Sequence, residues 1–91
     1  MKISDKKIEK ISEQILNYLF SVSPQSIFTS KIAQELARDE EFIKKLLLNL
    51  ESKKLIIEVK KNPKGIDYIR RSRWKLTNKI YQIYKQHQQS Q

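Results

Sequence analysis

Isoleucine and leucine recur at helical spacing near the start of the chain. The segment from Asp5 to Phe20 predicts a helix with one apolar stripe and with lysine, glutamate and asparagine off the stripe. The stripe consists of Ile8, Ile11, Ile15, Leu16 and Leu19. We expect Ser4 or Asp5 to cap this helix. The sequence SVSPQS, with a proline and three serines, is expected to end it, and the apolar SIF that follows predicts a short strand or a buried linker.

Two more helices are predicted in the middle of the chain. Thr29 or Ser30 is expected to cap a short helix of about eight residues whose apolar positions share one face. Asp39 is a favourable N-cap for a third helix that runs from Glu40 to about Lys53. The predicted buried stripe of the third helix is Ile43, Leu46, Leu47 and Leu50. Its opposite face carries Glu41, Lys45, Leu48, Asn49 and Ser52.

The pattern changes to alternation after the third helix, which predicts a β-hairpin. LIIEVKK, residues 55–61, predicts the first strand, and NPKG, residues 62–65, predicts a tight turn that contains the only glycine of the chain. IDYIRRSRWKL, residues 66–76, predicts the returning strand, with Trp74 in the core beneath the hairpin. One face of that strand is expected to hold Ile66, Tyr68, Trp74 and Leu76. Because the returning strand is longer than its partner, we expect a bulge or a frayed segment at residues 70–72.

A last helix is predicted after Thr77, which is expected to cap it. Its apolar stripe consists of Ile80, Ile83, Tyr84 and His87, with Tyr81 beside it. The polar end of the chain, QHQQSQ, is expected to fray. With 91 residues there is room for one core, so residues 1–91 are predicted to form a single domain, with the fold over about residues 4–86 and a frayed tail at 87–91.

The net charge of +9 is distributed unevenly along the chain. Residues 1–36 and residues 37–54 each carry five basic and four acidic side chains, whereas residues 55–91 carry nine basic and two acidic ones, a net charge of +7. A block of this kind creates a positive field over part of the surface and indicates a polyanionic partner. The alternative is that the charge only keeps an exposed hairpin soluble.

The order of the predicted elements resembles a winged helix-turn-helix domain. FTSKIAQELARDEEFIKKLLLNLESKKLI, residues 28–56, is similar to the second and third helices of that family leading into the first wing strand. WKLT, residues 74–77, is similar to the segment that closes the wing, although Lys54 stands where the family usually has glycine. Small archaeal and archaeal-virus regulators come closest in size and composition. The resemblance implies an α+β fold, a winged helix with a three-helix core and a two- to three-stranded β-wing, plus a C-terminal helix.

The resemblance also implies sequence-specific or semi-specific binding of double-stranded DNA by a small transcriptional regulator. The third helix would enter the major groove, and the basic hairpin would lie along the phosphate backbone. The expected contacts in the recognition helix are Lys44, Lys45, Asn49 and Ser52. Those in the wing are Lys60, Lys61, Lys64, Arg70, Arg71 and Arg73. The start of the second helix, with Thr29, Ser30 and Lys31, is expected to lie near the DNA backbone.

The third helix carries side chains that fit DNA unequally. Glu40 and Glu41 at its start favour the helix dipole but repel phosphate. Lys45 can reach a guanine edge or a phosphate, and Asn49 has the shape to read adenine. Leu48 has three interpretations, which are a contact with a thymine methyl group, an ordinary exposed leucine, or a protein contact.

Several classes of chemistry have no support in the sequence. With no cysteine and one histidine, the chain lacks the residues for a transition-metal cluster or for a Cys–His or Ser–His–Asp set. A single glycine excludes a glycine-rich phosphate loop. We therefore expect no catalytic residue, no metal and no cofactor. No apolar run is long enough for a membrane helix, and the start lacks the apolar block of a signal peptide, so an intracellular, cytoplasmic protein is expected.

A homodimer is the expected protein partner, and a second kind of partner belongs to an alternative function. A homodimer through the terminal helices follows if the stripes Ile8–Ile15 and Ile80–Tyr84 supply more apolar surface than one small core consumes. The alternative to a DNA-binding regulator is a winged-helix protein-interaction module within a transcription, replication or remodelling complex, with an acidic protein partner. A third interpretation is nucleic-acid packaging or RNA binding through the wing without sequence reading.

Overall fold

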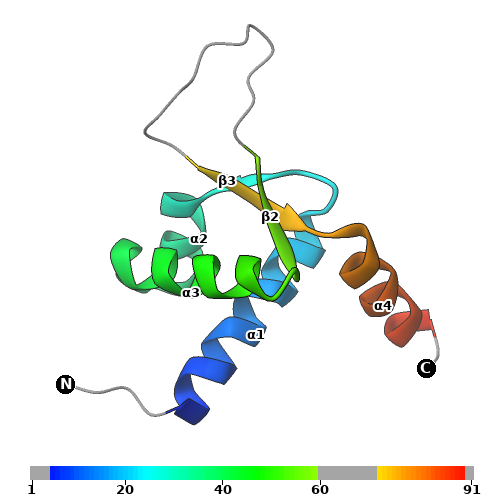
Figure 1. Cartoon of the computed structure of the whole chain (residues 1–91), viewed down its shortest axis with the longest axis horizontal. Helices are drawn as coiled ribbons and strands as arrows, with labels where there is room; N and C mark the ends of the chain where they lie inside the picture. The colour runs from blue at the N-terminus through cyan, green and yellow to red at the C-terminus, as the bar shows by residue number, and fades with distance from the viewer. Residues whose placement is uncertain (1–4, 60–71, 90–91) are drawn as a thin grey trace, which may run out of the picture.

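The order of helices and strands agrees with the predicted order. The computed structural model describes residues 5–59 and 72–89. The elements are α1 (Asp5–Val22), β1 (Ile27–Phe28), α2 (Thr29–Leu36), α3 (Glu40–Ser52), β2 (Ile56–Val59), β3 (Arg73–Leu76) and α4 (Asn78–Gln89). The first three helices lie on one side of a small sheet, and α4 lies beside them (Figure 1). The architecture is therefore an α+β winged helix with an additional C-terminal helix.

The sheet brings together three strands that are far apart in the sequence. Its order is β1-β3-β2, and both pairings are antiparallel. The central strand β3 pairs Trp74 with Ile27 on one side and with Glu58 on the other. Residues 60–71, which include the predicted NPKG turn and residues 70 and 71 of the predicted bulge, lie outside the described residues.

The core lies between the sheet and the three helices. Trp74 is fully buried, and Leu76, two residues further along β3, is also buried, so the predicted alternation is confirmed for these two positions. The apolar stripes of α1 and α3 are buried as well, with the exception of Ile8, which is half-buried. The core members from α1 to α3 are Ile11, Ile15, Leu16, Leu19, Ile32, Ala33, Ile43, Leu46, Leu47 and Leu50. The predicted core side is therefore correct for α1, α2 and α3, whereas in the stripe predicted for α4 Ile83 is 40% exposed and His87 is exposed.

The helix starts confirm two of the predicted caps and correct a third. The Asp39 carboxylate accepts a hydrogen bond from the Phe42 amide at 3.1 Å, as expected of an N-cap. The Thr77 hydroxyl accepts one from the Ile80 amide at 3.4 Å, at the start of α4. The expectation that Thr29 or Ser30 caps α2 is wrong, because Phe28 holds the cap position without a side-chain hydrogen bond and Thr29 is already the first helical residue.

Two helices end on residues with left-handed backbone geometry that are not glycine. Ala37 after α2 has φ 53°, and Lys54 after α3 has φ 62°. At the second site the Lys54 amide donates to the Glu51 carbonyl at 2.9 Å, and the Leu55 amide donates to the Leu50 carbonyl at 3.1 Å. This pairing is the Schellman motif, which normally places glycine at the left-handed position. Lys54 therefore holds the conformation for which the winged-helix family usually uses glycine.

Helix α4 packs beside the end of α1 through aromatic side chains. The ring of Phe20 lies 5.4 Å from that of Tyr81 and 5.5 Å from that of Tyr84, measured between centroids. The helix continues to Gln89, so residues 87–89, which were predicted to fray, are helical. Within residues 5–59 and 72–89, no helix has both the length and the apolar character that crossing a membrane requires.

Candidate nucleic-acid interface

The outward face of α3 is the side of the helix that is opposite to its buried stripe. Helix α3 is held by a buried stripe on its inner side, and it follows α2 after a turn at residues 37–39. All four residues predicted to contact DNA from this helix are exposed, and Leu48 beside them is 47% exposed. The four are Lys44, Lys45, Asn49 and Ser52. The structure thus brings the predicted α3 residues to one side of the molecule.

The outward face of α3 is not basic. The helix contains two lysines and three glutamates, which gives it a formal net charge of −1. Glu40 and Glu41 lie in its first turn, next to the capping Asp39, where negative charge is stabilised by the helix dipole. Coulombic attraction to phosphate at this helix is consequently weak, and any affinity for DNA requires positive charge from elsewhere in the chain.

The hydroxyl group of Ser52 is engaged within its own helix. It donates a hydrogen bond to the carbonyl of Asn49 at 2.6 Å. The proton of that hydroxyl is therefore used, although the oxygen can still accept a hydrogen bond. Of the predicted α3 contacts, Lys44, Lys45 and Asn49 are left with side chains that can donate to DNA.

At the start of α2, one of the three residues predicted to contact the DNA backbone is buried, and the other two are exposed. Thr29 is 7% exposed; its hydroxyl accepts a hydrogen bond from the indole nitrogen of Trp74 at 2.7 Å and donates to the Ser72 carbonyl at 3.4 Å. The side chain of Thr29 is thus a core group, because a buried indole N–H must be satisfied inside the protein. Its predicted place at the DNA backbone is wrong, whereas Ser30 and Lys31 are exposed.

Lys31 belongs to an ion pair on the surface of α2. Its ammonium nitrogen lies 3.0 Å from a carboxylate oxygen of Glu35, one turn further along the helix. The hydrogen bond to Glu35 and the charge of Glu35 raise the pKa of Lys31. A phosphate at this position would have to compete with Glu35 for the same ammonium group.

The predicted wing residues fall mostly in the segment between β2 and β3. Lys60, Lys61, Lys64, Arg70 and Arg71 lie outside the described residues. Arg73 lies on β3, where its guanidinium carbon is 5.5 Å from the centroid of the Phe28 ring. This contact fixes Arg73 against the outer face of β1, since a guanidinium over an aromatic face is attracted by the ring.

Sequence reasoning missed two features of the sheet. Lys75 lies on the same strand as Arg73, two residues away, so the alternation of β3 places both cations on the outer side. The contact between Phe28 and Arg73 depends on the pairing of β1 with β3. Alternation alone was sufficient to find Lys75, but no local signal identifies the partner of Phe28.

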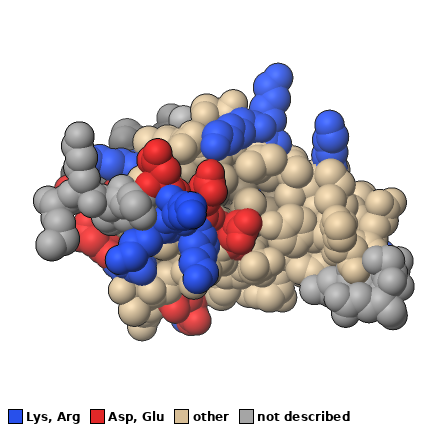
Figure 2. All heavy atoms as spheres, turned by 90° about the horizontal axis from the view of Figure 1, so that it is seen from below, with Lys and Arg blue, Asp and Glu red and all other residues tan. Residues whose placement is uncertain are grey.

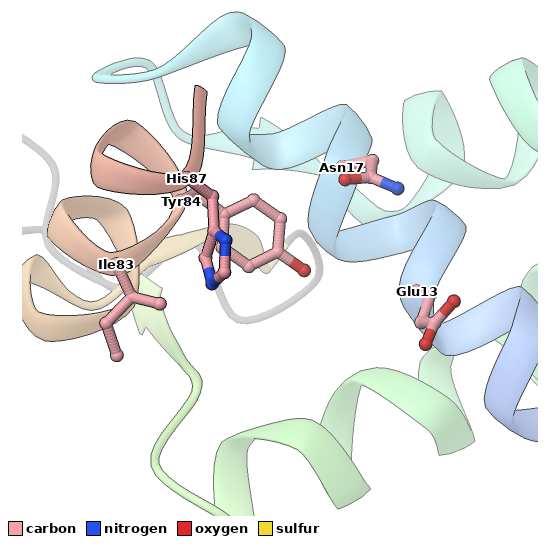
Figure 3. Close-up of a pocket in the computed structure, with 5 residues that line it drawn as sticks. All are labelled: Glu13, Asn17, Ile83, Tyr84 and His87. Carbon is pink, nitrogen blue, oxygen red and sulfur yellow. The ribbon is translucent and has the colours of Figure 1, made fainter. Parts of the chain in front are cut away.

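The terminal helices form a groove that bears on the predicted dimer. Glu13 and Asn17 of α1 face Ile83, Tyr84 and His87 of α4 across a volume of about 420 Å³ (Figure 3). Partial burial, and to a smaller extent the charge of Glu13, raise the pKa of the Tyr84 hydroxyl.

On the face shown in Figure 2, acidic and basic side chains are interspersed toward one end, and uncharged side chains cover most of the other end.

Part of the apolar surface predicted for dimerisation is buried within the chain. Ile11 and Ile15 of α1 are buried in the core of the same chain, because the α1 stripe holds the helix against the sheet. Of the predicted Ile8–Ile15 stripe, Ile8 remains partly exposed and could contribute to an interface. On α4, Ile83 is 40% exposed, and Ile80 and Tyr84 are half-buried.

Comparisons with known proteins find likeness in structure only. No protein-family model and no curated protein sequence matches the chain. A complex of MepR from Staphylococcus aureus with DNA has a TM-score of 0.70 and 26% identity over 93% of this chain and 69% of that one. A MepR mutant from a multidrug-resistant clinical isolate of S. aureus has a TM-score of 0.68 and 26% identity over 90% of this chain and 60% of that one. A mutant of ZitR from Lactococcus lactis has a TM-score of 0.69 and 27% identity over 98% of this chain and 56% of that one.

These similarities concern the fold and cover only part of the larger proteins. The chain spans about 60% of the length of the MepR and ZitR mutant structures. The proteins come from Staphylococcus and Lactococcus, so they give no support to the resemblance to archaeal or archaeal-virus regulators. With a TM-score near 0.7 over nine-tenths or more of the chain, the likeness places this protein among winged-helix structures that include a transcription regulator solved with DNA.

Proposed function

We propose that this chain binds double-stranded DNA as a small transcriptional regulator, with α3 in the major groove. The observation that carries the proposal is the outward face of α3, which exposes Lys44, Lys45, Leu48 and Asn49 from a helix anchored by its opposite side. Support comes from MepR, which has the same fold, was solved in complex with DNA and is described as a transcription regulator of the multidrug efflux pump MepA. The role is one of binding, and no catalytic step is assigned.

In this proposal, affinity and sequence reading belong to different parts of the chain. Helix α3 has a net charge of −1, whereas residues 55–91 carry +7. We assign the phosphate contacts to the basic segment 60–73, with Ser30 and Lys31 as further contacts at the start of α2. The base edges are assigned to Lys44, Lys45 and Asn49, with Ser52 as an acceptor at the end of the face.

The test is a titration into labelled random-sequence duplex DNA, followed by fluorescence anisotropy at several salt concentrations. One variant replaces Arg70, Arg71 and Arg73 by glutamine. The matched control replaces Lys6, Lys7 and Lys10 by glutamine, which removes the same charge from the start of α1, at the end of the molecule away from the sheet (Figure 1). Because each phosphate contact contributes about 0.9 to the slope of log K against log salt, the arginine variant should lose about two to three units of slope.

The outcomes of the titration separate the alternatives. A large loss of slope in the arginine variant and a small loss in the lysine control support a phosphate contact at segment 60–73. Equal losses in both variants indicate attraction by net charge alone. If the wild-type chain does not bind duplex DNA even at low salt, the proposed function is wrong.

A second copy of the chain is the proposed protein partner. One winged-helix domain reads few base pairs, and symmetric dimers are the commonest way to double a DNA site. The interface is assigned to the exposed side of α4 around Ile83, next to the groove with α1. Sedimentation should show that Ile83→Glu shifts the chain to monomer. The control Ile57→Glu, at a position of similar exposure on β2, should leave the dimer intact.

The acidic start of α3 favours one other function. The two glutamates in the first turn of the helix that exposes Leu48 are unusual for a surface that meets phosphate, and they suit a protein-interaction module within a larger complex. Under that alternative, duplex DNA does not bind, and Leu48→Ala weakens the capture of a protein partner instead. The same titration therefore decides between the two functions.

A further inference from the structure

We infer that Leu48 and Asn49 make this chain a reader of A·T base pairs, with Leu48 packed on the methyl group of a thymine and Asn49 bonded to a neighbouring adenine. The inference rests on the proposed function, because it presumes that α3 enters the major groove. It names the chemistry of the bases that the outward face of α3 recognises.

Leu48 is the most exposed large hydrophobic side chain among the described residues. Its exposed fraction is 47%, compared with 38–41% for Phe28, Ile57 and Ile83. At about 100° per residue, Leu48 lies within roughly 30° of the direction opposite to the buried stripe of α3. The leucine therefore points directly outward, and packing within the chain does not account for its position.

The side chains that neighbour Leu48 on the surface of α3 are polar. Lys44 and Lys45 lie one turn before it, and Glu51 and Ser52 lie one turn after it. The lysines have long side chains that can pass beside a base edge to reach phosphate or guanine. The Ser52 proton is already donated to the Asn49 carbonyl. Leu48 is thus the only member of this group that offers a purely apolar contact.

Among the four bases, only thymine presents an apolar group in the major groove, its C5 methyl. A leucine placed over cytosine N4 or guanine O6 would remove water from a hydrogen-bonding group without replacing its bond, which is unfavourable. Leu48 therefore favours thymine in two ways. It packs against the thymine methyl group, and it makes contact with cytosine or guanine at the same place unfavourable.

Asn49 is placed to read the next base pair. It is exposed, one residue further along the helix than Leu48 and rotated by about 100° from it. Its side-chain amide has one acceptor and one donor group that match N6 and N7 of adenine. Two adjacent side chains of α3 then specify two adjacent A·T pairs without using positive charge, which agrees with the net charge of −1 on this helix.

The experiment changes one chemical group of the DNA at a time. A duplex selected from random sequence by the wild-type chain is resynthesised with deoxyuridine in place of one thymine at a time, which deletes only the methyl group. Competition binding should find one thymine whose replacement weakens wild-type binding about three- to fivefold, as expected for one buried methyl group. Leu48→Ala should bind more weakly and be indifferent to that replacement, whereas the control Ile57→Ala should keep the methyl effect.

A parallel set uses 7-deazaadenine, which lacks the N7 acceptor. One substituted adenine next to the sensitive thymine should weaken wild-type binding about three- to tenfold and leave Asn49→Ala unaffected. Thermal unfolding checks that each variant is folded. The inference is overturned if wild type binds the selected duplex but no thymine methyl matters, or if Leu48→Ala keeps the full methyl effect. A wild-type chain that binds no duplex overturns the proposed function, and this inference with it.

Discussion

The hydrogen bond between Trp74 and Thr29 is expected to contribute substantially to the stability of the chain. The indole nitrogen of the fully buried Trp74 donates to the Thr29 hydroxyl at 2.7 Å, and Thr29 is itself 7% exposed. Thr29→Val removes the hydroxyl while keeping the branched shape of the side chain. The substitution leaves the indole N–H without its acceptor in a place that water does not reach.

The magnitude follows from the burial of the donor. A typical hydrogen bond contributes about 0.5–1.5 kcal/mol to stability, but a buried donor left unsatisfied costs about 1–3 kcal/mol. Because Trp74 is 0% exposed, the larger range applies, and we expect a loss of about 2 kcal/mol. For a domain of this size, each kcal/mol corresponds to about 4–8 °C, so Tm should fall by about 8–16 °C.

A double-mutant cycle tests whether the hydrogen bond is the cause. Urea unfolding followed by circular dichroism compares wild type, Thr29→Val, Trp74→Phe and the double variant. Phenylalanine has no N–H, so Thr29→Val should cost much less in the Trp74→Phe background, with a coupling of about 1–2 kcal/mol. Thr29→Ser, which retains the hydroxyl, is the control. An equal cost of Thr29→Val in both backgrounds would refute this reasoning.

Three further predictions concern the end of α3, its start and the terminal helices. Lys54→Gly should stabilise the chain by about 1 kcal/mol in urea unfolding, because glycine removes the steric cost of φ 62°, whereas Lys53→Gly, at φ −86°, should destabilise it. Glu41→Gln should tighten duplex DNA binding at low salt by removing a charge near phosphate, and Glu9→Gln on α1 should not. The raised pKa of Tyr84 means that the folded chain holds this proton more tightly than the unfolded chain, so stability should fall as pH rises above about 10, and less so in Tyr84→Phe.

The local pattern of the sequence was sufficient to predict the helices and the buried sides of α1, α2 and α3. Asp39 was identifiable as a cap because it precedes an apolar helical repeat, and the carboxylate indeed bonds to the Phe42 amide. Trp74 was placed in the core because it alternates with Leu76. These predictions succeeded since each depends on neighbours within one or two turns or along one strand.

The errors arose where a side chain serves a distant part of the chain. Thr29 has the residue type and the position of a cap, but its hydroxyl is used by Trp74, 45 residues away. The pairing of β1 with β3 brings these two residues together, and no periodicity in the sequence reveals it. The stripe of α1 was likewise visible, but whether the core or a second copy covers Ile11 and Ile15 depends on the whole packing arrangement.

The start of α3 explains why we assign base recognition and phosphate binding to different parts of this chain. Asp39 caps the helix, which is worth about 0.5–2 kcal/mol, and the two glutamates of the first turn add about 0.3–1 kcal/mol each through the helix dipole. The first turn of α3 is therefore stabilised by negative charge at the place where a phosphate-binding helix would carry positive charge. Such a helix gains little binding free energy from charge attraction to phosphate, which is the same for any DNA sequence. Its contribution to DNA binding therefore has to come from contacts that depend on the bases. Leu48 and Asn49, which are uncharged and exposed beyond the acidic turn, are the residues that such a division of roles requires.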